Sequence, residues 1–255
     1  MSEHIRMPSK TLRLLGLTLA AWAPALAAAE FVINPLRLSL DRSNRATEVV
    51  IRNEDKAPLR MQVQAMSWRQ DSAGNDQYEP SDGLIYFPRA LEIPAGESRI
   101  VRVGIRAAPV ALEEAYRLFI EELPPPAAKA AAASASVRVL IRVGVPVFVA
   151  PAHAERKPAV TQPAVKSGQV RWSVSNAGNV HFAADRVELS ALARDGTTLL
   201  TQQFKERYFL AGTVKPLQSD LPPEVCVQAA AVEVSVVGES LDLRRRVDVK
   251  PGACR

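Results

Sequence analysis

The sequence contains few side chains with the chemistry of a catalytic site. Its three histidines are His4, His153 and His181. A histidine acts as the base of a nucleophilic enzyme when a Ser or Cys lies beside it, and the chain has no Gly-x-Ser-x-Gly, His-Glu-x-x-His or Cys-x-x-Cys motif. We therefore predict that the protein is not an enzyme and needs no cofactor, which disfavours a secreted hydrolase. His181, in an extended stretch beside Asn179, is expected to be a structural polar group.

Arg37 is the residue whose type and place favour a binding role. It lies in an alternating extended stretch near the N-terminus, and a guanidinium binds a carboxylate in bidentate geometry. A carboxylate clamp and an ordinary solvent-facing strand arginine both fit this pattern. Glu121 and Glu122 are successive residues of a predicted strand, so their side chains point to opposite faces. We expect them to form salt bridges rather than a catalytic acid pair.

The first 29 residues have the pattern of a secretory signal peptide. Three basic residues precede an apolar run over 14–29, which ends in an alanine-rich stretch. We predict cleavage near Ala29 and secretion of the mature chain. No later stretch approaches the roughly 18 unbroken apolar residues of a membrane span, so the mature protein is expected to be soluble and to have no span.

Cys226 and Cys254 are the only two cysteines. In an oxidising compartment a disulfide between them is the default expectation, and closing a loop of this length stabilises a fold by about 3 kcal/mol. Two cysteines and three scattered histidines do not supply a metal-ligand set. We predict one disulfide and no metal site.

The composition permits one large core or two ordinary ones. The chain has 255 residues, of which 47% are apolar and 23% are charged. Its formal net charge is only +5, and the basic residues are dispersed along strand patterns, so nucleic acid is not an expected partner.

Period-two alternation and Pro/Gly turns predict an all-β fold. The pattern indicates strands in the first part at 31–40, 47–53, 59–68, 84–87, 90–93, 98–105 and 115–123, and in the second part at 170–174, 180–182, 185–194, 198–204, 232–237 and 241–249. Short strands at this spacing are typical of immunoglobulin-like sandwiches. A segment rich in Pro, Ala and charge begins at Ala150, so we predict domains over 30–150 and 151–255.

The strand predicted over 137–149 differs from the others. Its second half is almost wholly apolar, which predicts burial at that end and exposure at the other. A Pro-rich and then Ala/Ser-rich run before it predicts a mobile loop. Such an edge strand is either an aggregation hazard or a surface that another chain pairs, while a central strand covered within its own domain is the alternative. In its first half the apolar face consists of Val137, Val139, Ile141 and Val143.

A family resemblance rests on several stretches taken together. They are Phe87-Pro88 with 91–103, 116–124, Val-Pro-Val-Phe-Val at 145–149, Asn-Ala-Gly-Asn-Val-His at 176–181 and Tyr-Phe-Leu-Ala-Gly at 208–212. Across the mature length the chain resembles periplasmic pilus-assembly chaperones of the PapD-like superfamily, and the Val-Pro-Val-Phe version is most similar to the archaic, Csu-like branch. The resemblance implies two immunoglobulin-like sandwich domains in an L- or boomerang-shaped arrangement.

The resemblance also implies a mechanism. A pilin lacks the last strand of its sandwich, and the chaperone fills the groove with its own strand until another subunit replaces it. By position, Val137, Val139 and Ile141 match the donor residues, and Val143 continues their row. Burying three such side chains is worth roughly 5–9 kcal/mol before the costs of association. The implied partners are pilin subunits and an outer-membrane usher, with self-association when no client is bound.

Two further roles are implied by position. Arg37 matches the cleft arginine that anchors the subunit's C-terminal carboxylate. The usual lysine partner falls at Pro146, so Arg142 is the expected substitute, with Arg89 and Arg117 as alternatives.

A family interdomain arginine falls at Ala150, so the domain angle is expected to be held through Arg102 and Glu122. The competing hypothesis for the whole chain is a secreted two-domain adhesin or ligand-binding module that keeps its strand at 137–149 paired internally.

Overall fold

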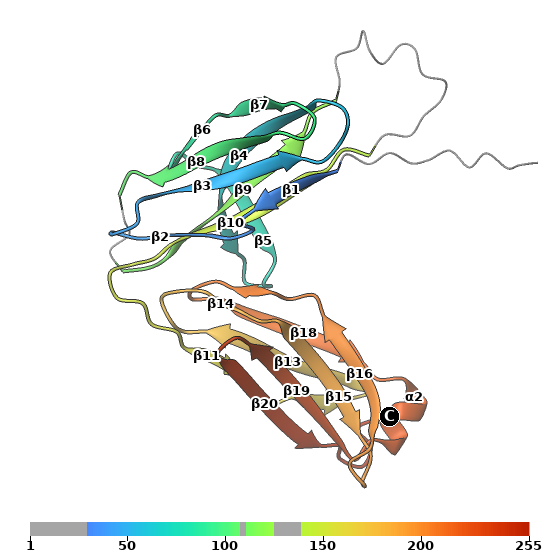
Figure 1. The fold of residues 1–255 in the computed structure, drawn as a ribbon. Coiled ribbons are helices and arrows are strands. Elements are labelled where there is room, and N and C mark those ends of the chain that lie inside the picture. Colours follow the sequence, from blue (N-terminus) through green and yellow to red (C-terminus); the bar gives the residue numbers. More distant parts are fainter. Residues whose placement is uncertain (1–29, 108–110, 125–138, 255) are drawn as a thin grey trace, which may run out of the picture.

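The computed structural model describes residues 30–107, 111–124 and 139–254. They form two β-sandwiches that lie at an angle to one another and join where β10 (Arg142–Val149) leads towards β11 (Pro158–Val160) (Figure 1). Within these ranges the one helix is α2 (Pro223–Gln228). The predicted all-β fold of two immunoglobulin-like sandwiches is confirmed. The predicted signal peptide, residues 1–29, lies outside the described residues.

The N-terminal sandwich packs two sheets face to face. Besides β10, its strands are β1 (Phe31–Asn34), β2 (Leu38–Leu40), β3 (Ala46–Asn53), β4 (Leu59–Gln70), β5 (Asp76–Pro80), β6 (Leu84–Phe87), β7 (Ala90–Ile93), β8 (Ser98–Ile105) and β9 (Glu114–Glu122). One sheet has the order β1-β3-β8-β6 and the other β2-β10-β9-β4-β5, with β7 also paired to β4. Alternate residues fill the space between the sheets, as Met61 and Leu118 do, because side chains on a strand alternate between its faces.

The segment 31–40 belongs to both sheets. Its first half, β1, pairs antiparallel with β3, and its second half, β2, pairs parallel with β10. Pro35 lies between them, where it removes no ladder hydrogen bond from either pairing. This change of sheet places Arg37 at the entry to β2, beside the C-terminal half of β10.

The C-terminal sandwich begins with β11. Its other strands are β12 (Ala164–Lys166), β13 (Gln169–Asn176), β14 (Phe182–Ala183), β15 (Arg186–Leu192), β16 (Thr198–Phe204), β17 (Tyr208–Phe209), β18 (Val214–Asp220), β19 (Ala231–Gly238) and β20 (Leu241–Asp248). β13 pairs with β11, β12 and β18, β14 pairs with β17, and the remaining sheet has the order β16-β15-β19-β20. Trp172, Leu189 and Val234 lie in the core between the larger sheets.

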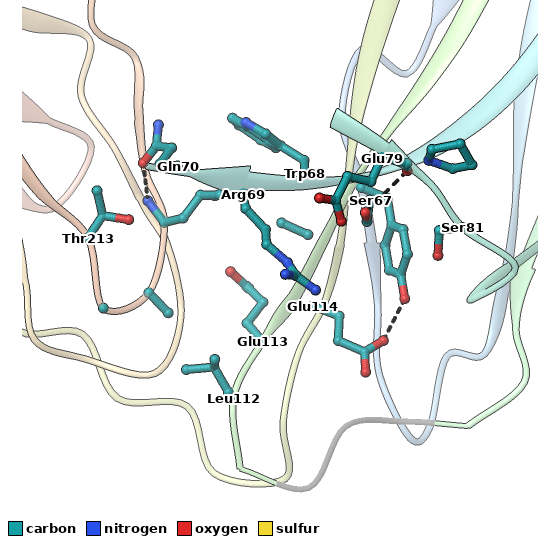
Figure 2. Close-up of a pocket in the computed structure, with 16 residues that line it drawn as sticks. Ser67, Trp68, Arg69, Gln70, Glu79, Ser81, Leu112, Glu113, Glu114 and Thr213 are labelled. Carbon is teal, nitrogen blue, oxygen red and sulfur yellow. Dashed lines mark hydrogen bonds between the residues drawn. The ribbon is translucent and has the colours of Figure 1, made fainter. Parts of the chain in front are cut away.

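An aromatic cluster joins the two sandwiches. Trp68 of β4 and Phe148 of β10 pack with Leu210 of the C-terminal sandwich, and all three are buried. Phe148 also stacks on His181, with ring centroids 3.5 Å apart and planes 10° from parallel. Gln70 adds two hydrogen bonds across the junction. Its Oε1 accepts from the Leu210 N–H (3.0 Å) (Figure 2), and its Nε2 donates to the Tyr208 carbonyl (2.9 Å).

A buried ionisable pair lies beside this cluster. One oxygen of Glu113, from the loop before β9, lies 2.8 Å from both the backbone nitrogen and the Nδ1 of His181. The side chains of Glu113 and His181 are 4% and 13% exposed. The neighbouring Asn179 donates from Nδ2 to the Ala111 carbonyl (2.9 Å). His181 is therefore a bonded polar group, as predicted from the sequence, and it lies at the junction of the sandwiches.

Arg102 and Glu122 do not hold the domains together, so that expectation was wrong. Arg102 lies on β8, where its Nε is 3.1 Å from Glu48 of the same sheet and its side chain is 79% exposed. Glu122 lies at the far end of β9 from Glu114, about 26 Å along the strand from the junction at a rise of about 3.3 Å per residue. The aromatic cluster and the Glu113–His181 pair make the contact instead.

The predicted disulfide is present. Cys226 of α2 bonds to Cys254 near the C-terminus, closing a loop with a sequence separation of 28 residues. Within the part of the chain that the structure describes, no helix has the length and apolar character needed to cross a membrane.

Replacing both cysteines by Ser should lower the free energy of unfolding by about 3–4 kcal/mol, because the open chain gains loop entropy when unfolded. Equilibrium urea denaturation measures this difference. Wild-type protein unfolded in dithiothreitol is the control and should match the double variant. Equal stability of the oxidised wild type and the variant would contradict the prediction.

Replacing Glu113 by Ala should lower the free energy of unfolding by about 1–3 kcal/mol, because the His181 N–H and Nδ1 lose their buried partner. Glu121→Ala is the matched control: Glu121 is 50% exposed and 3.6 Å from Arg142, so its loss should cost under about 0.5 kcal/mol. Urea denaturation of both variants makes the comparison. Indistinguishable values would show that the Glu113–His181 pair does not stabilise the junction.

Candidate functional site

The apolar face of β10 leaves the core gradually toward its N-terminal end. Val147 and Val145 are buried opposite Tyr116 and Leu118 of β9. Val143 is partly buried and still packs against the core, Ile141 is also partly buried, and Val139 is 47% exposed. Val139 and Ile141 precede β10 and have the same parity as Val143, so the apolar row of the strand leads into them. The predicted change from exposed to buried along the strand is confirmed. Val137 lies outside the described residues.

β10 has an open edge over this part. β9 pairs with it along Arg142–Val149, whereas β2 pairs only with its last three residues, Val147–Val149. Within the described chain no strand pairs with the other edge of β10 from Arg142 to Pro146. Unpaired backbone N–H and C=O groups beside an apolar row form a template for strand addition.

Arg142 lies on the opposite face of β10 and is already engaged. Its Nε is 3.6 Å from Oε2 of Glu121, and its guanidinium carbon lies 4.0 Å from the Phe119 ring centroid. Arg142 is four residues from Pro146, about 13 Å along the strand. The structure therefore keeps Arg142 apart from Arg37, so the expectation that these two arginines form one carboxylate anchor was wrong.

Arg37 lies in the cleft between the sandwiches. Because Leu38 is opposite Val147 in the parallel register, Arg37 comes next to Pro146. It lines a cavity of about 360 Å³ together with Arg156 and His181. Within the described chain, no hydrogen bond or ion pair involves the Arg37 guanidinium.

The two alternative anchors are placed differently. Arg117 is directly across from Pro146, but its guanidinium carbon lies 3.8 Å from the Trp68 ring centroid and its Nη1 donates to the Gly144 carbonyl (3.2 Å). Arg89 lies in the N-terminal sandwich with its guanidinium carbon 5.2 Å from the Tyr86 ring centroid. Neither lines the cavity that contains Arg37.

A second, larger cavity of about 620 Å³ lies on the other side of the aromatic cluster. It is lined by the end of β4, the start of β9 and the 210–213 turn (Figure 2). The Tyr116 hydroxyl donates to Glu114 there (2.7 Å), and burial together with this bond raises the pKa of Tyr116. No His or Cys is among the residues that line this cavity.

Sequence reasoning missed Glu113, Trp68 and Arg156. Glu113 and Trp68 lie far apart in the sequence from the residues they contact, and no local pattern predicts such contacts. Arg156 lies in the Pro- and charge-rich segment that the sequence marked only as a linker. Among the described residues, no group of three or more His, Cys, Asp and Glu side chains is arranged to hold a metal ion.

The sequence was compared with protein families and with curated proteins. Residues 30–155 match the family model described as pili and flagellar-assembly chaperone, PapD N-terminal domain. No curated protein is a significant match to the chain.

Solved structures share the fold over both sandwiches. A chain of the CsuC–CsuE chaperone–tip adhesion subunit pre-assembly complex from the archaic Csu pili of Acinetobacter baumannii is 22% identical, with a TM-score of 0.57 and coverage of 86% of this chain and 98% of that chain. A chain of the Salmonella enterica SafA pilin–SafB chaperone complex is 13% identical, with a TM-score of 0.57 and coverage of 88% and 99%. The E. coli chaperone DraB is 13% identical, with a TM-score of 0.54 and coverage of 87% and 100%.

The family match covers the N-terminal sandwich, whereas the structural matches cover both sandwiches. The family model identifies the sequence of the N-terminal sandwich, and the solved structures share the arrangement of two sandwiches. The family consists of assembly chaperones and is not an enzyme class. Residues 30–155, which include the N-terminal sandwich, thus belong to the PapD family of pilus-assembly chaperones.

Proposed function

We propose that this chain is a periplasmic chaperone of the chaperone–usher pathway, of the archaic Csu-like branch. It stabilises pilin subunits by donor-strand complementation and delivers them to an outer-membrane usher. The observation that carries the proposal is the apolar row of β10, which leaves the core along an unpaired strand edge. The CsuC–CsuE and SafA–SafB complexes, which share the fold, support subunits as partners.

The donor residues are Val137, Val139, Ile141 and Val143. Val143 lies on β10, Ile141 and Val139 precede the strand with the same parity, and Val137 continues this period of two in the sequence. A subunit sandwich that lacks its last strand gains both a backbone ladder and these side chains. Each side chain that becomes fully buried contributes roughly 1.5–3 kcal/mol before association costs.

The anchored half of β10 makes this strand an effective donor. Val145, Val147 and Phe148 are buried within the chaperone itself, so the direction of β10 is set before a subunit binds. A strand that is already extended loses less conformational entropy on pairing than a free loop does. The subunit therefore meets a preformed template.

Arg37 is the proposed anchor for the C-terminal carboxylate of the subunit. Its unpaired guanidinium lies in the cleft, at the end of β10 opposite the donor residues. A carboxylate bound there would fix the register of the subunit along β10. Arg142 is withdrawn from this role because it is engaged with Glu121 and lies outside the cleft.

The alternative is a secreted adhesin-like module that keeps this strand covered. An internally paired strand would show partners on both edges, whereas the described part of β10 has an open edge from Arg142 to Pro146. The exposed Val139 and Leu140 beside that edge also favour a strand that is covered by a second chain. A client covers it in the proposed function, and a second copy covers it when no client is present.

The proposed function also includes a compartment and two domains. An export signal over 1–29 brings the chain to the periplasm, where Cys226 and Cys254 oxidise. The functional domains are 30–150, which carries the donor strand, and 151–255. The work of the protein is binding and release, with no catalytic step.

Changing Val139 and Ile141 together to Asp should weaken subunit binding by roughly 100-fold or more, because two apolar contacts are replaced by charges facing an apolar groove. The measurement is co-expression in a bacterial periplasm with the secreted small proteins encoded beside this chain, followed by pull-down and sizing of the complex.

The matched control is Ile85→Asp with Ile100→Asp. These residues are 49% and 46% exposed, on the sheet that does not contain β10. The control should retain the complex. Undiminished subunit recovery with the Val139/Ile141 variant would overturn the donor-strand proposal.

A further inference from the structure

The cleft cavity brings together charged residues from both sandwiches. Arg37 and Ser39 come from the start of β2, Arg156 comes from the segment before β11, and His181 and Glu239 come from the C-terminal sandwich. The cavity holds about 360 Å³. That space admits the end of a peptide chain, and two guanidinium groups favour an anionic occupant.

Neither arginine is neutralised by a neighbour. Within the described chain, Arg37 and Arg156 take part in no hydrogen bond or ion pair through their side chains. The residues on either side of Arg156 pair with each other, because Lys157 Nζ is 2.8 Å from Oε1 of Glu155. Both guanidinium groups are therefore available to an incoming anion.

The backbone that carries Arg156 is held in place. Asn179 accepts a hydrogen bond from the Glu155 N–H at its side-chain oxygen (2.6 Å) and donates from Nδ2 to the His153 carbonyl (2.8 Å). Ala177 N–H donates to the Lys157 carbonyl (3.0 Å). These bonds flank Arg156 on both sides.

Gly178 permits the close approach of this segment. A Cβ at Gly178 would lie 2.2 Å from the Glu155 carbonyl oxygen, closer than any side chain allows. The 176–179 turn and the 153–157 segment are thus packed backbone to backbone. Arg156 is presented to the cavity from a fixed platform.

We infer that Arg37 and Arg156 together bind the C-terminal carboxylate of the client subunit, so that the anchor is divided between the two sandwiches. This inference rests on the proposed function and refines its carboxylate site. Pro146, which lies next to Arg37 in the parallel register, has no charge to offer. Arg156 supplies the second charge from the other side of the cleft, and each carboxylate oxygen can accept from one guanidinium.

The divided anchor has two consequences. A bound carboxylate links the sandwiches and adds to the contact made by Glu113 and His181. Glu239, the one carboxylate lining the cavity, opposes an anion there, so its neutralisation should strengthen binding.

The test uses an N-acetylated alanine tripeptide, as the free acid and as the C-terminal amide, titrated at low salt into the mature protein. Side-chain Nε–Hε resonances of the arginines report binding. The resonances of Arg37 and Arg156 should both shift with the acid and neither with the amide. Arg37→Ala and Arg156→Ala should each weaken binding of the acid roughly fivefold or more, whereas Arg142→Ala should leave it unchanged. Glu239→Gln should tighten it about two- to fivefold.

A response of Arg37 without Arg156, a response of Arg142, or no difference between acid and amide would each overturn the inference. Arg156→Gln replaces Arg156→Ala if the latter unfolds. The donor-strand variant Val139→Asp/Ile141→Asp should bind the tripeptide acid as the wild type does. Failure to capture subunits with a normal tripeptide titration would therefore count against the proposed function and not against the divided anchor.

Discussion

The packing of Phe148 between the two sandwiches is the contact on which the arrangement depends. Phe148 is 2% exposed, stacks on His181 and lies against Trp68, whose ring centroid is 5.8 Å away. The neighbouring Val147 and Val149 point the other way, into the core of the N-terminal sandwich. One end of β10 is thus held by both sandwiches at once. That double hold explains how the other end can expose an apolar row and an open edge without the strand leaving its sheet.

The same junction sets the geometry of the cleft. His181 contacts Phe148 with its ring and Glu113 with its Nδ1, and it also lines the cavity that contains Arg37. The turn before it, through Asn179, fixes the segment that carries Arg156. The same residues therefore support β10 and position the charged side chains of the cleft. These residues belong to the Asn-Ala-Gly-Asn-Val-His stretch at 176–181. Gly178 in this stretch permits a close backbone approach to the 153–157 segment, and His181 pairs with Glu113.

Local patterns in the sequence predicted most strands and the behaviour of β10, because alternation records which face of a strand is buried. They did not predict β18 or α2, since Pro216, Pro222 and Pro223 interrupt the alternation there. Long-range contacts were the main failure. The interdomain role expected of Arg102 and Glu122 and the site expected to be shared by Arg37 and Arg142 were wrong, because period and parity do not say which ends of two strands meet. Arg156 was missed because a linker composition carries no sign of the cavity it faces.

The central claim is that a second chain pairs with the open edge of β10, and backbone hydrogen exchange tests it most directly. Amides from Val139 to Val145 should include a set that exchanges rapidly in the free monomer and becomes strongly protected in a complex with a subunit, while amides of β3 and β8 remain unchanged. Equal protection of the β10 amides in the free monomer and in the complex would contradict the account, because it would show that the strand is already paired within its own chain.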